Sequence, residues 1–152
     1  MCKSPQAGRE RTRRKRILIV EDDPILGDLL LEALQEEEEE AYEASHVLSG
    51  EMAQSILQTD APALVLLDYH LPGMNGLELA DWLRSREKLE HIPILLMSAD
   101  TPQEVSGKKH LRTLQKPFEL ETLLQVVAEL LVSGAKDDPG SEKAFSYGDG
   151  AR

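Results

Sequence analysis

The stretch that decides the fold is LVLLDYHLPGMNG, residues 64–76. Its first four residues are all apolar, which is typical of a strand buried on both faces of a parallel sheet. The run ends on the carboxylate of Asp68, and turn-forming Pro and Gly residues follow it. An acid at this position lies at the carboxyl edge of a sheet, where open α/β sheets bind ligands. Asp68 could instead simply cap the turn, and this stretch alone leaves both interpretations open.

The charge of the chain is unevenly distributed. The total is −11, yet residues 1–16 carry seven Lys or Arg and one Glu, so the remaining chain carries −17. Such an acidic body disfavours nucleic acid and favours cations or basic protein surfaces. We expect one domain at residues 16–133, between a disordered basic arm (1–15) and a disordered tail (134–152). The arm could touch nucleic acid or anionic lipid, but we favour a solubilising role.

Other features of composition indicate where the protein works. Cys2 is the one cysteine, so an internal disulfide is excluded. No apolar run approaches the length of a membrane span, and the basic start does not resemble a signal peptide. We therefore expect a cytoplasmic protein without membrane contact.

Short apolar runs alternate with stretches of helical periodicity five times along the chain. The apolar stripe of the last helical stretch, for example, recurs every three or four residues from Leu120 to Leu130. Strands that alternate with helices predict a parallel sheet covered on both faces. The predicted fold is a doubly wound, five-stranded (βα)₅ sheet of the flavodoxin-like α/β class. We expect its strands near residues 17–20, 42–47, 64–68, 92–97 and 111–115.

Four of the five predicted strands end on polar residues that can act together. The carboxyl ends of parallel strands meet at one edge of the sheet, so these side chains can converge. Clustered acids repel one another, and Mg²⁺ bound through oxygens relieves that repulsion. A lysine and a hydroxyl opposite them could hold a phosphoryl group, which indicates an aspartyl phosphate site. The residues, in strand order, are Glu21, Asp22, Asp68, Ser98 and Lys116.

Four motifs together resemble one known family. They are ILIVEDDP (17–24), DYHLPGMNG (68–76), ILLMSA (94–99) and KPF (116–118). Each is weak alone, but all four occur in order at predicted strand ends. The chain is similar to receiver domains of bacterial two-component response regulators, in particular stand-alone, chemotaxis-regulator-like ones. The resemblance covers residues 16–132.

The resemblance implies a role for each matched residue. It makes Asp68 the phosphoacceptor, with Mg²⁺ (or Mn²⁺) held nearby by acids and by one backbone carbonyl. The implied metal ligands are Glu21, Asp22, Asp68 and the carbonyl of His70. The implied contacts to the phosphoryl group are Ser98 and Lys116, and the small Ala99 leaves the acceptor accessible.

Two departures from the family pattern concern signal output. The segment between Ser98 and Lys116 is short for the family, so we expect a shortened fourth helix. Thr113 stands where the family usually has an aromatic residue. We therefore expect phosphorylation to change mainly the loop after Ser98. The acidic run at residues 36–40 also lengthens the connection after the first helix.

The predicted function is that of a phosphoprotein in a two-component or phosphorelay signalling system. The expected phosphodonor is a sensor histidine kinase or a histidine phosphotransfer protein, and the expected output is contact with a downstream protein. We expect a monomer or weak dimer that binds no nucleic acid. We also expect no enzyme activity beyond its own phosphorylation and dephosphorylation.

Several alternatives remain at this point. The chain could be a receiver fragment of a larger regulator or hybrid kinase. It could be an aspartyl-phosphate phosphohydrolase, although that class generally has a second acid two residues beyond the nucleophile, where His70 stands. A flavodoxin-type cofactor binder is disfavoured, because the loop after the first strand lacks the residues that cradle a phosphate.

Overall fold

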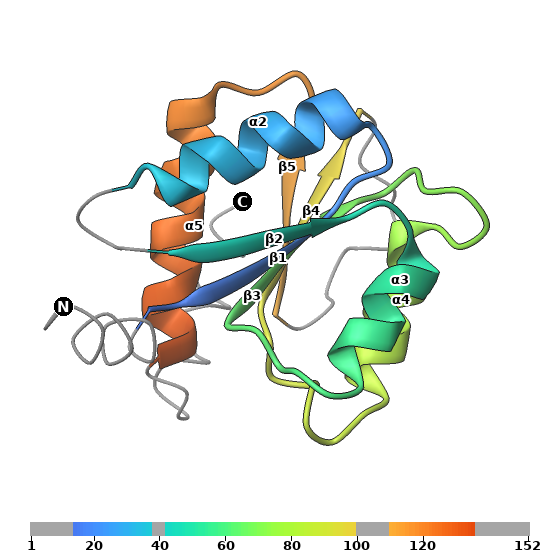
Figure 1. The fold of residues 1–152 in the computed structure, drawn as a ribbon. Helices are drawn as coiled ribbons and strands as arrows, with labels where there is room; N and C mark the ends of the chain where they lie inside the picture. The colour runs from blue at the N-terminus through green and yellow to red at the C-terminus, as the bar shows by residue number, and fades with distance from the viewer. Residues whose placement is uncertain (1–13, 38–41, 100–109, 136–152) are drawn as a thin grey trace, which may run out of the picture.

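The computed structural model describes residues 14–37, 42–99 and 110–135. Five strands form one parallel sheet in the order β2-β1-β3-β4-β5 (Figure 1). The strands are β1 (Arg16–Val20), β2 (Glu43–Val47), β3 (Leu64–Asp68), β4 (Ile94–Ser98) and β5 (Leu111–Gln115). The helices in these ranges are α2 (Pro24–Gln35), α3 (Gly50–Leu57), α4 (Gly76–Arg84) and α5 (Leu120–Ala135).

The order of the strands confirms the predicted doubly wound, flavodoxin-like fold. The strand that differs most from its predicted range is β4, which begins at Ile94 rather than at residue 92, whereas β1 and β2 each begin within one residue of the prediction. Pro93 lacks an N–H for the ladder, although its carbonyl still accepts from the Val65 N–H at 3.1 Å. At the end of the domain, α5 continues two residues into the predicted tail, to Ala135.

Some predictions concern residues outside the described ranges. These are the basic arm up to residue 13, most of the acidic run at 36–40, the shortened fourth helix within 100–109, and the tail from 136. The domain boundaries also stay predictions. No helix within the described ranges is both long and apolar enough to cross a bilayer.

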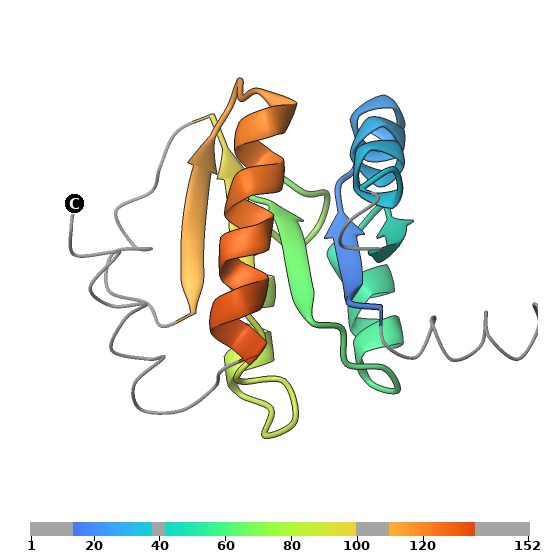
Figure 2. The same cartoon turned by 90° about the vertical axis from the view of Figure 1, so that its left-hand side faces the viewer.

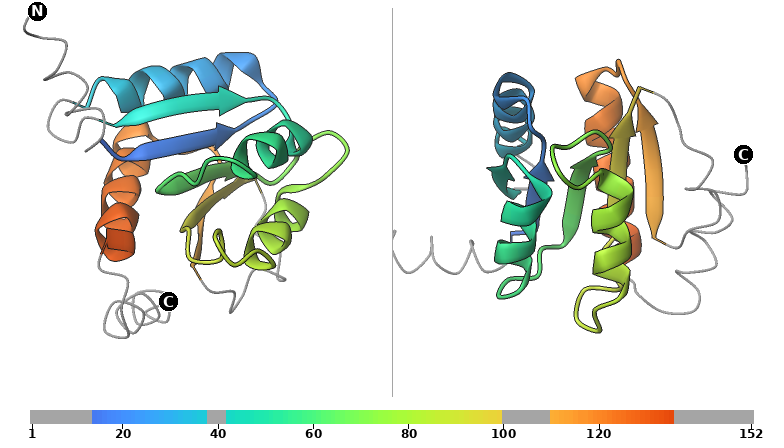
Figure 3. Two further views of the ribbon diagram at one scale, coloured as in Figure 1. Left: turned by 60° about the horizontal axis from the view of Figure 1, so that its bottom comes forward. Right: turned by 90° about the vertical axis from the view of Figure 1, so that its right-hand side faces the viewer.

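The sheet separates two apolar layers, because successive side chains of a strand point to opposite faces. In β3, Val65 and Leu67 pack under α3 and α4, whereas Leu64 and Leu66 pack under α2 and α5. Figure 2 shows α5 and α2 on one side of the sheet, and Figure 3 (right) shows α3 and α4 on the other. A strand buried on both faces explains why residues 64–67 are apolar without alternation.

Each helix that follows β1, β2 and β3 starts at a side-chain cap. Asp23 accepts from the Ile25 N–H at 3.0 Å, and Ser49 accepts from the Met52 N–H at 3.2 Å. Asn75 and Glu78 form a reciprocal capping box, with both bonds 2.9 Å long. The caps end the strand-to-helix loops at defined residues and so hold the loops at the carboxyl edge of the sheet.

Gly76 lets the loop after β3 return close to the strand. Its N–H donates to the Tyr69 carbonyl at 2.7 Å. A Cβ atom at this position would lie 2.7 Å from the Asp68 carbonyl oxygen and 2.9 Å from Leu96 Cδ1. Any side chain here would push against the backbone of the residue that ends β3.

We expect Gly76→Ala to lower the free energy of unfolding by about 1–3 kcal/mol, because the clash is with backbone that cannot move aside cheaply. Urea denaturation monitored by circular dichroism measures the change. Ser55→Ala, at an exposed position of α3, is the control and should stay within about 0.5 kcal/mol of the wild type. Equal losses in the two variants would contradict the close-approach argument.

Candidate functional site

Residues at the carboxyl ends of four strands lie together at one edge of the sheet. Val20 pairs with Leu67, which brings the residues that follow β1 beside Asp68 at the end of β3. Ser98 pairs with Gln115, and the Lys116 N–H donates to the Ser98 carbonyl at 2.8 Å. The structure therefore brings the predicted acids, hydroxyl and lysine to one place, while their chemical roles stay predictions.

Three carboxylates form a compact cluster at this edge. One carboxylate oxygen from each of Glu21, Asp22 and Asp68 lies within 4.8 Å of the other two. Glu21 and Asp68 are buried, with 1% and 3% of their surface exposed, whereas Asp22 is exposed. The cluster thus has two acids inside the protein and one at the solvent, so a ligand could reach it from outside.

The carboxylate of Glu21 is only partly satisfied. Its Oε2 accepts from the Asp23 N–H at 3.1 Å, but its buried Oε1 has no hydrogen-bond partner in the described structure. Burial raises the pKa of Glu21 from 4.5 to about 7, because the favourable Asp23 N–H only partly offsets it and the charge of Asp68 adds to it. A buried oxygen without a donor, beside two further carboxylates, fits a divalent cation bound through oxygens.

Lys116 is the cation that faces these acids. Its Nζ donates to Asp68 Oδ1 at 3.1 Å and lies 3.5 Å from Glu21 Oε1. Burial lowers the pKa of Lys116, but the hydrogen bond to Asp68 and the charges of both acids outweigh burial and raise it. Among the described residues of this edge, one ammonium group faces three carboxylates, so negative charge is in excess.

The other predicted residues surround the cluster. Ser98 is buried at the end of β4, and Ala99 is exposed, with its carbonyl accepting from Gln115 Nε2 at 3.3 Å. His70 is exposed in the loop after β3, where its ring packs edge-on against Tyr69 at 4.8 Å between centroids. Its imidazole is not part of the acidic cluster, and coordination through its carbonyl stays a prediction.

Two neighbours of the acids were not predicted from the sequence. Asp23 supports Glu21 through its backbone N–H, as described above. His46, on β2, has its Nε2 2.8 Å from the Glu21 carbonyl oxygen. The signal available in the sequence was a histidine within the predicted strand at 42–47, but only the fold reveals its partner.

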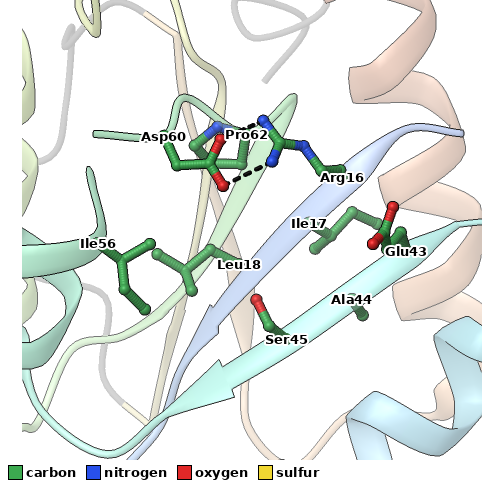
Figure 4. A pocket seen from close by; sticks show the side chains of 9 residues that line it. All are labelled: Arg16, Ile17, Leu18, Glu43, Ala44, Ser45, Ile56, Asp60 and Pro62. Atoms are coloured by element: carbon green, nitrogen blue, oxygen red, sulfur yellow. Dashed lines mark hydrogen bonds and ion pairs between the residues drawn. The ribbon is translucent and has the colours of Figure 1, made fainter. Parts of the chain in front are cut away.

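A separate cavity of about 140 Å³ lies at the opposite ends of the strands (Figure 4). It contains the first residues of β1 and β2 and the ion pair between Arg16 and Asp60. None of the predicted site residues lines it. Its lining residues are Arg16, Ile17, Leu18, Glu43, Ala44, Ser45, Ile56, Asp60 and Pro62.

Comparison with known families agrees with this geometry. The family model of the response regulator receiver domain matches residues 17–128. The chain belongs to this family. It is thus a receiver domain of the two-component signalling systems, in agreement with the four sequence motifs.

Relatives of the domain are bacterial response regulators. The phosphate regulon transcriptional regulatory protein PhoB of Rhizobium meliloti (strain 1021) is 35% identical over 76% of this chain and 52% of its own length. The response regulator protein FleR of Pseudomonas aeruginosa is 35% identical over 84% of this chain and 26% of its own length. The receiver therefore spans about half of the first relative and about a quarter of the second.

Solved structures of receivers superimpose on the domain. The signal receiver domain of a signal transduction histidine kinase from Syntrophus aciditrophicus has a TM-score of 0.71 and 30% identity, over 82% of this chain and 94% of its own. The chemotaxis response regulator CheY4 of Vibrio cholerae has a TM-score of 0.68 at 24% identity, over 77% of this chain and 98% of its own. The second similarity concerns the fold alone.

The raised pKa of Glu21 predicts how stability of the receiver depends on pH in the absence of divalent cations. The folded state holds the proton of Glu21 more tightly than the unfolded chain, so this contribution is complete below pH 4.5 and is lost as the pH rises to about 7. The loss is on the order of 3 kcal/mol. We expect Glu21→Gln, which cannot ionise, to lack this part of the decline.

Urea denaturation in EDTA at intervals from pH 4.5 to 8 measures this difference. Glu32→Gln, at an exposed position on α2, is the matched control and should follow the wild-type profile. If Glu21→Gln declines as steeply as the wild type, the carboxyl is not protonated in the folded protein.

Proposed function

We propose that Asp68 of this receiver takes a phosphoryl group from a phosphohistidine donor. The observation that carries the proposal is the buried Asp68 carboxylate, held 3.1 Å from the ammonium of Lys116 beside two further acids. An Asp68 oxygen bonds to phosphorus while the phosphorus–nitrogen bond of the donor breaks, and the imidazole nitrogen keeps the electron pair of that bond. The product is an aspartyl phosphate.

The chain's own residues can assist this transfer by positioning and by charge. Lys116 already touches Asp68, so its ammonium is placed to contact an oxygen of the incoming phosphoryl group. Ser98, at the neighbouring strand end, offers a hydroxyl to another oxygen. Ala99 is small and exposed, which leaves room for the donor beside the acceptor.

Glu21, Asp22 and Asp68, with the carbonyl of His70, would hold Mg²⁺ or Mn²⁺. The buried Oε1 of Glu21 accepts no hydrogen bond, although Lys116 Nζ lies 3.5 Å from it. This oxygen and the net negative charge of the cluster support the assignment. When bound, the cation supplies positive charge that offsets the acids and the phosphoryl oxygens.

The receiver catalyses nothing beyond its own phosphorylation and dephosphorylation in this proposal. Receiver domains are in general phosphoacceptors rather than enzymes. A phosphohydrolase would want a second acid two residues after the nucleophile, and the exposed His70 occupies that position. The phosphohydrolase alternative is therefore disfavoured.

The partners follow from the same chemistry. The donor would be a sensor histidine kinase or a histidine phosphotransfer protein, and the output would be contact with a downstream protein in the cytoplasm. The receiver would act as a monomer or weak dimer, without nucleic acid. Relatives such as PhoB are named as transcriptional regulators, but the receiver accounts for only part of their length.

We expect Asp68→Asn to abolish phosphorylation by acetyl phosphate, because the amide cannot act as the nucleophile. Intact-mass spectrometry measures the labelled fraction. Asp28→Asn, on the exposed surface of α2, is the matched control and should be labelled like the wild type. Full labelling of Asp68→Asn would place the acceptor elsewhere.

We also expect Asp22→Ala to weaken Mg²⁺ binding by about tenfold or more, because it removes one of the three clustered carboxylates. Isothermal titration calorimetry of the unphosphorylated protein gives the affinity. The control is Asp28→Ala, which removes an acid outside the cluster and should leave the affinity unchanged. If Asp22→Ala bound Mg²⁺ with the affinity of the wild type, the metal assignment would be wrong.

A further inference from the structure

His46 lies against a helix position that has no side chain. Residue 46 pairs with Ile19 on the neighbouring β1, and its half-buried ring packs on Gly27 of α2. A Cβ atom at Gly27 would lie only 2.0 Å from Cε1 and 2.2 Å from Nε2 of the imidazole. The ring therefore occupies space that only glycine leaves open.

Glycine is unfavourable in the interior of a helix, because it loses more conformational freedom on folding than any other residue. Gly27 is nevertheless the fourth residue of α2 and is buried. The short distances from a Cβ atom at Gly27 to the His46 ring explain why glycine stands here, since alanine would displace the ring.

The ring holds the backbone of the acidic cluster. Its Nε2 lies 2.8 Å from the Glu21 carbonyl oxygen. A carbonyl can only accept, so Nε2 must carry the hydrogen. The next residue of β2 holds the other side of Glu21, because the Glu21 N–H donates to the Val47 carbonyl at 3.1 Å. Both peptide groups that flank Glu21 are thus fixed by consecutive residues of one strand.

The peptide group bound by His46 is the one that joins Glu21 to Asp22. Its orientation decides how the two carboxylates are placed relative to each other and to Asp68. Because the three acids lie within 4.8 Å and repel one another, the backbone must hold them in place.

We propose that His46, seated on Gly27, is a positioning residue for the divalent cation site. This inference rests on the Mg²⁺ site proposed above. His46 is not itself a ligand in it; its ring fixes the peptide that carries two of the ligands. Outer-shell hydrogen bonds of this kind affect metal affinity through the orientation of the ligands.

The first experiment separates the hydrogen bond of His46 from its bulk. His46→Leu keeps an apolar side chain on Gly27 but has no donor, and we expect its Kd for Mg²⁺ to rise about tenfold. His46→Gln retains an N–H that can reach the carbonyl, so its Kd should stay near that of the wild type. Calorimetric titration with Mg²⁺ alone gives both values, and thermal unfolding in EDTA reports stability separately.

The second experiment changes Gly27, so that the test of the inference does not rest on the folding of His46→Leu alone. Gly27→Ala should displace the ring and weaken Mg²⁺ binding to a similar degree as His46→Leu. In a His46→Ala background the same Gly27→Ala change meets no ring, so it should add no further loss. A non-additive cycle of this kind reports direct coupling between the two positions.

The outcomes separate this inference from the proposed function. If the wild type binds no Mg²⁺, the metal site and the role of His46 both fall. If the wild type binds Mg²⁺ and His46→Leu binds it equally well, only the role of His46 is overturned. Equal weakening in His46→Gln and His46→Leu, or additive losses in the cycle, would also overturn it, because the hydrogen bond would not be the cause.

Discussion

The electrostatic balance at the carboxyl edge of the sheet is the constraint on which this receiver depends. One oxygen from each of three carboxylates lies within 4.8 Å of the others, and among the described residues Lys116 is the cation in contact with two of them, Asp68 and Glu21. The parallel sheet makes this convergence possible, because it brings the ends of β1, β3 and β5 to one side. The apolar layers on both faces keep those strand ends rigid, so like charges can be held at short distance without the fold yielding to their repulsion.

Much of the fold could be predicted because its signals are local. The uninterrupted apolar run at residues 64–67 indicates a strand buried on both faces, and the apolar stripe from Leu120 to Leu130 indicates the last helix. The start of β4 was misplaced because Ile92 is as apolar and as buried as a strand residue, and only the missing N–H of Pro93 separates it from the ladder.

The sequence predicted which residues form the site, but it did not predict the raised pKa of Glu21. The sequence predicted which acids lie together, because they follow predicted strands and the carboxyl ends of parallel strands share one edge of the sheet. The sequence carries no measure of how deeply Glu21 is buried or of where its two oxygens point, and these decide that its pKa rises to about 7. The contact of His46 with Glu21 was equally hidden, since it joins strands that are neighbours in space but separated by a helix in sequence.

The same charges link the stability of the domain to its chemistry. A ligand shifts an equilibrium only by its different affinity for the two states. In this structure, the ammonium of Lys116 is shared by two buried acids, Glu21 and Asp68. A phosphoryl group on Asp68 would present new oxygens to that ammonium and to the hydroxyl of Ser98, and so would draw both strand ends toward the acceptor. On β5, Thr113 is half-buried where the family usually has an aromatic residue, so little bulk is available to follow that movement. The signal from such a site should therefore remain close to the strand ends that generate it.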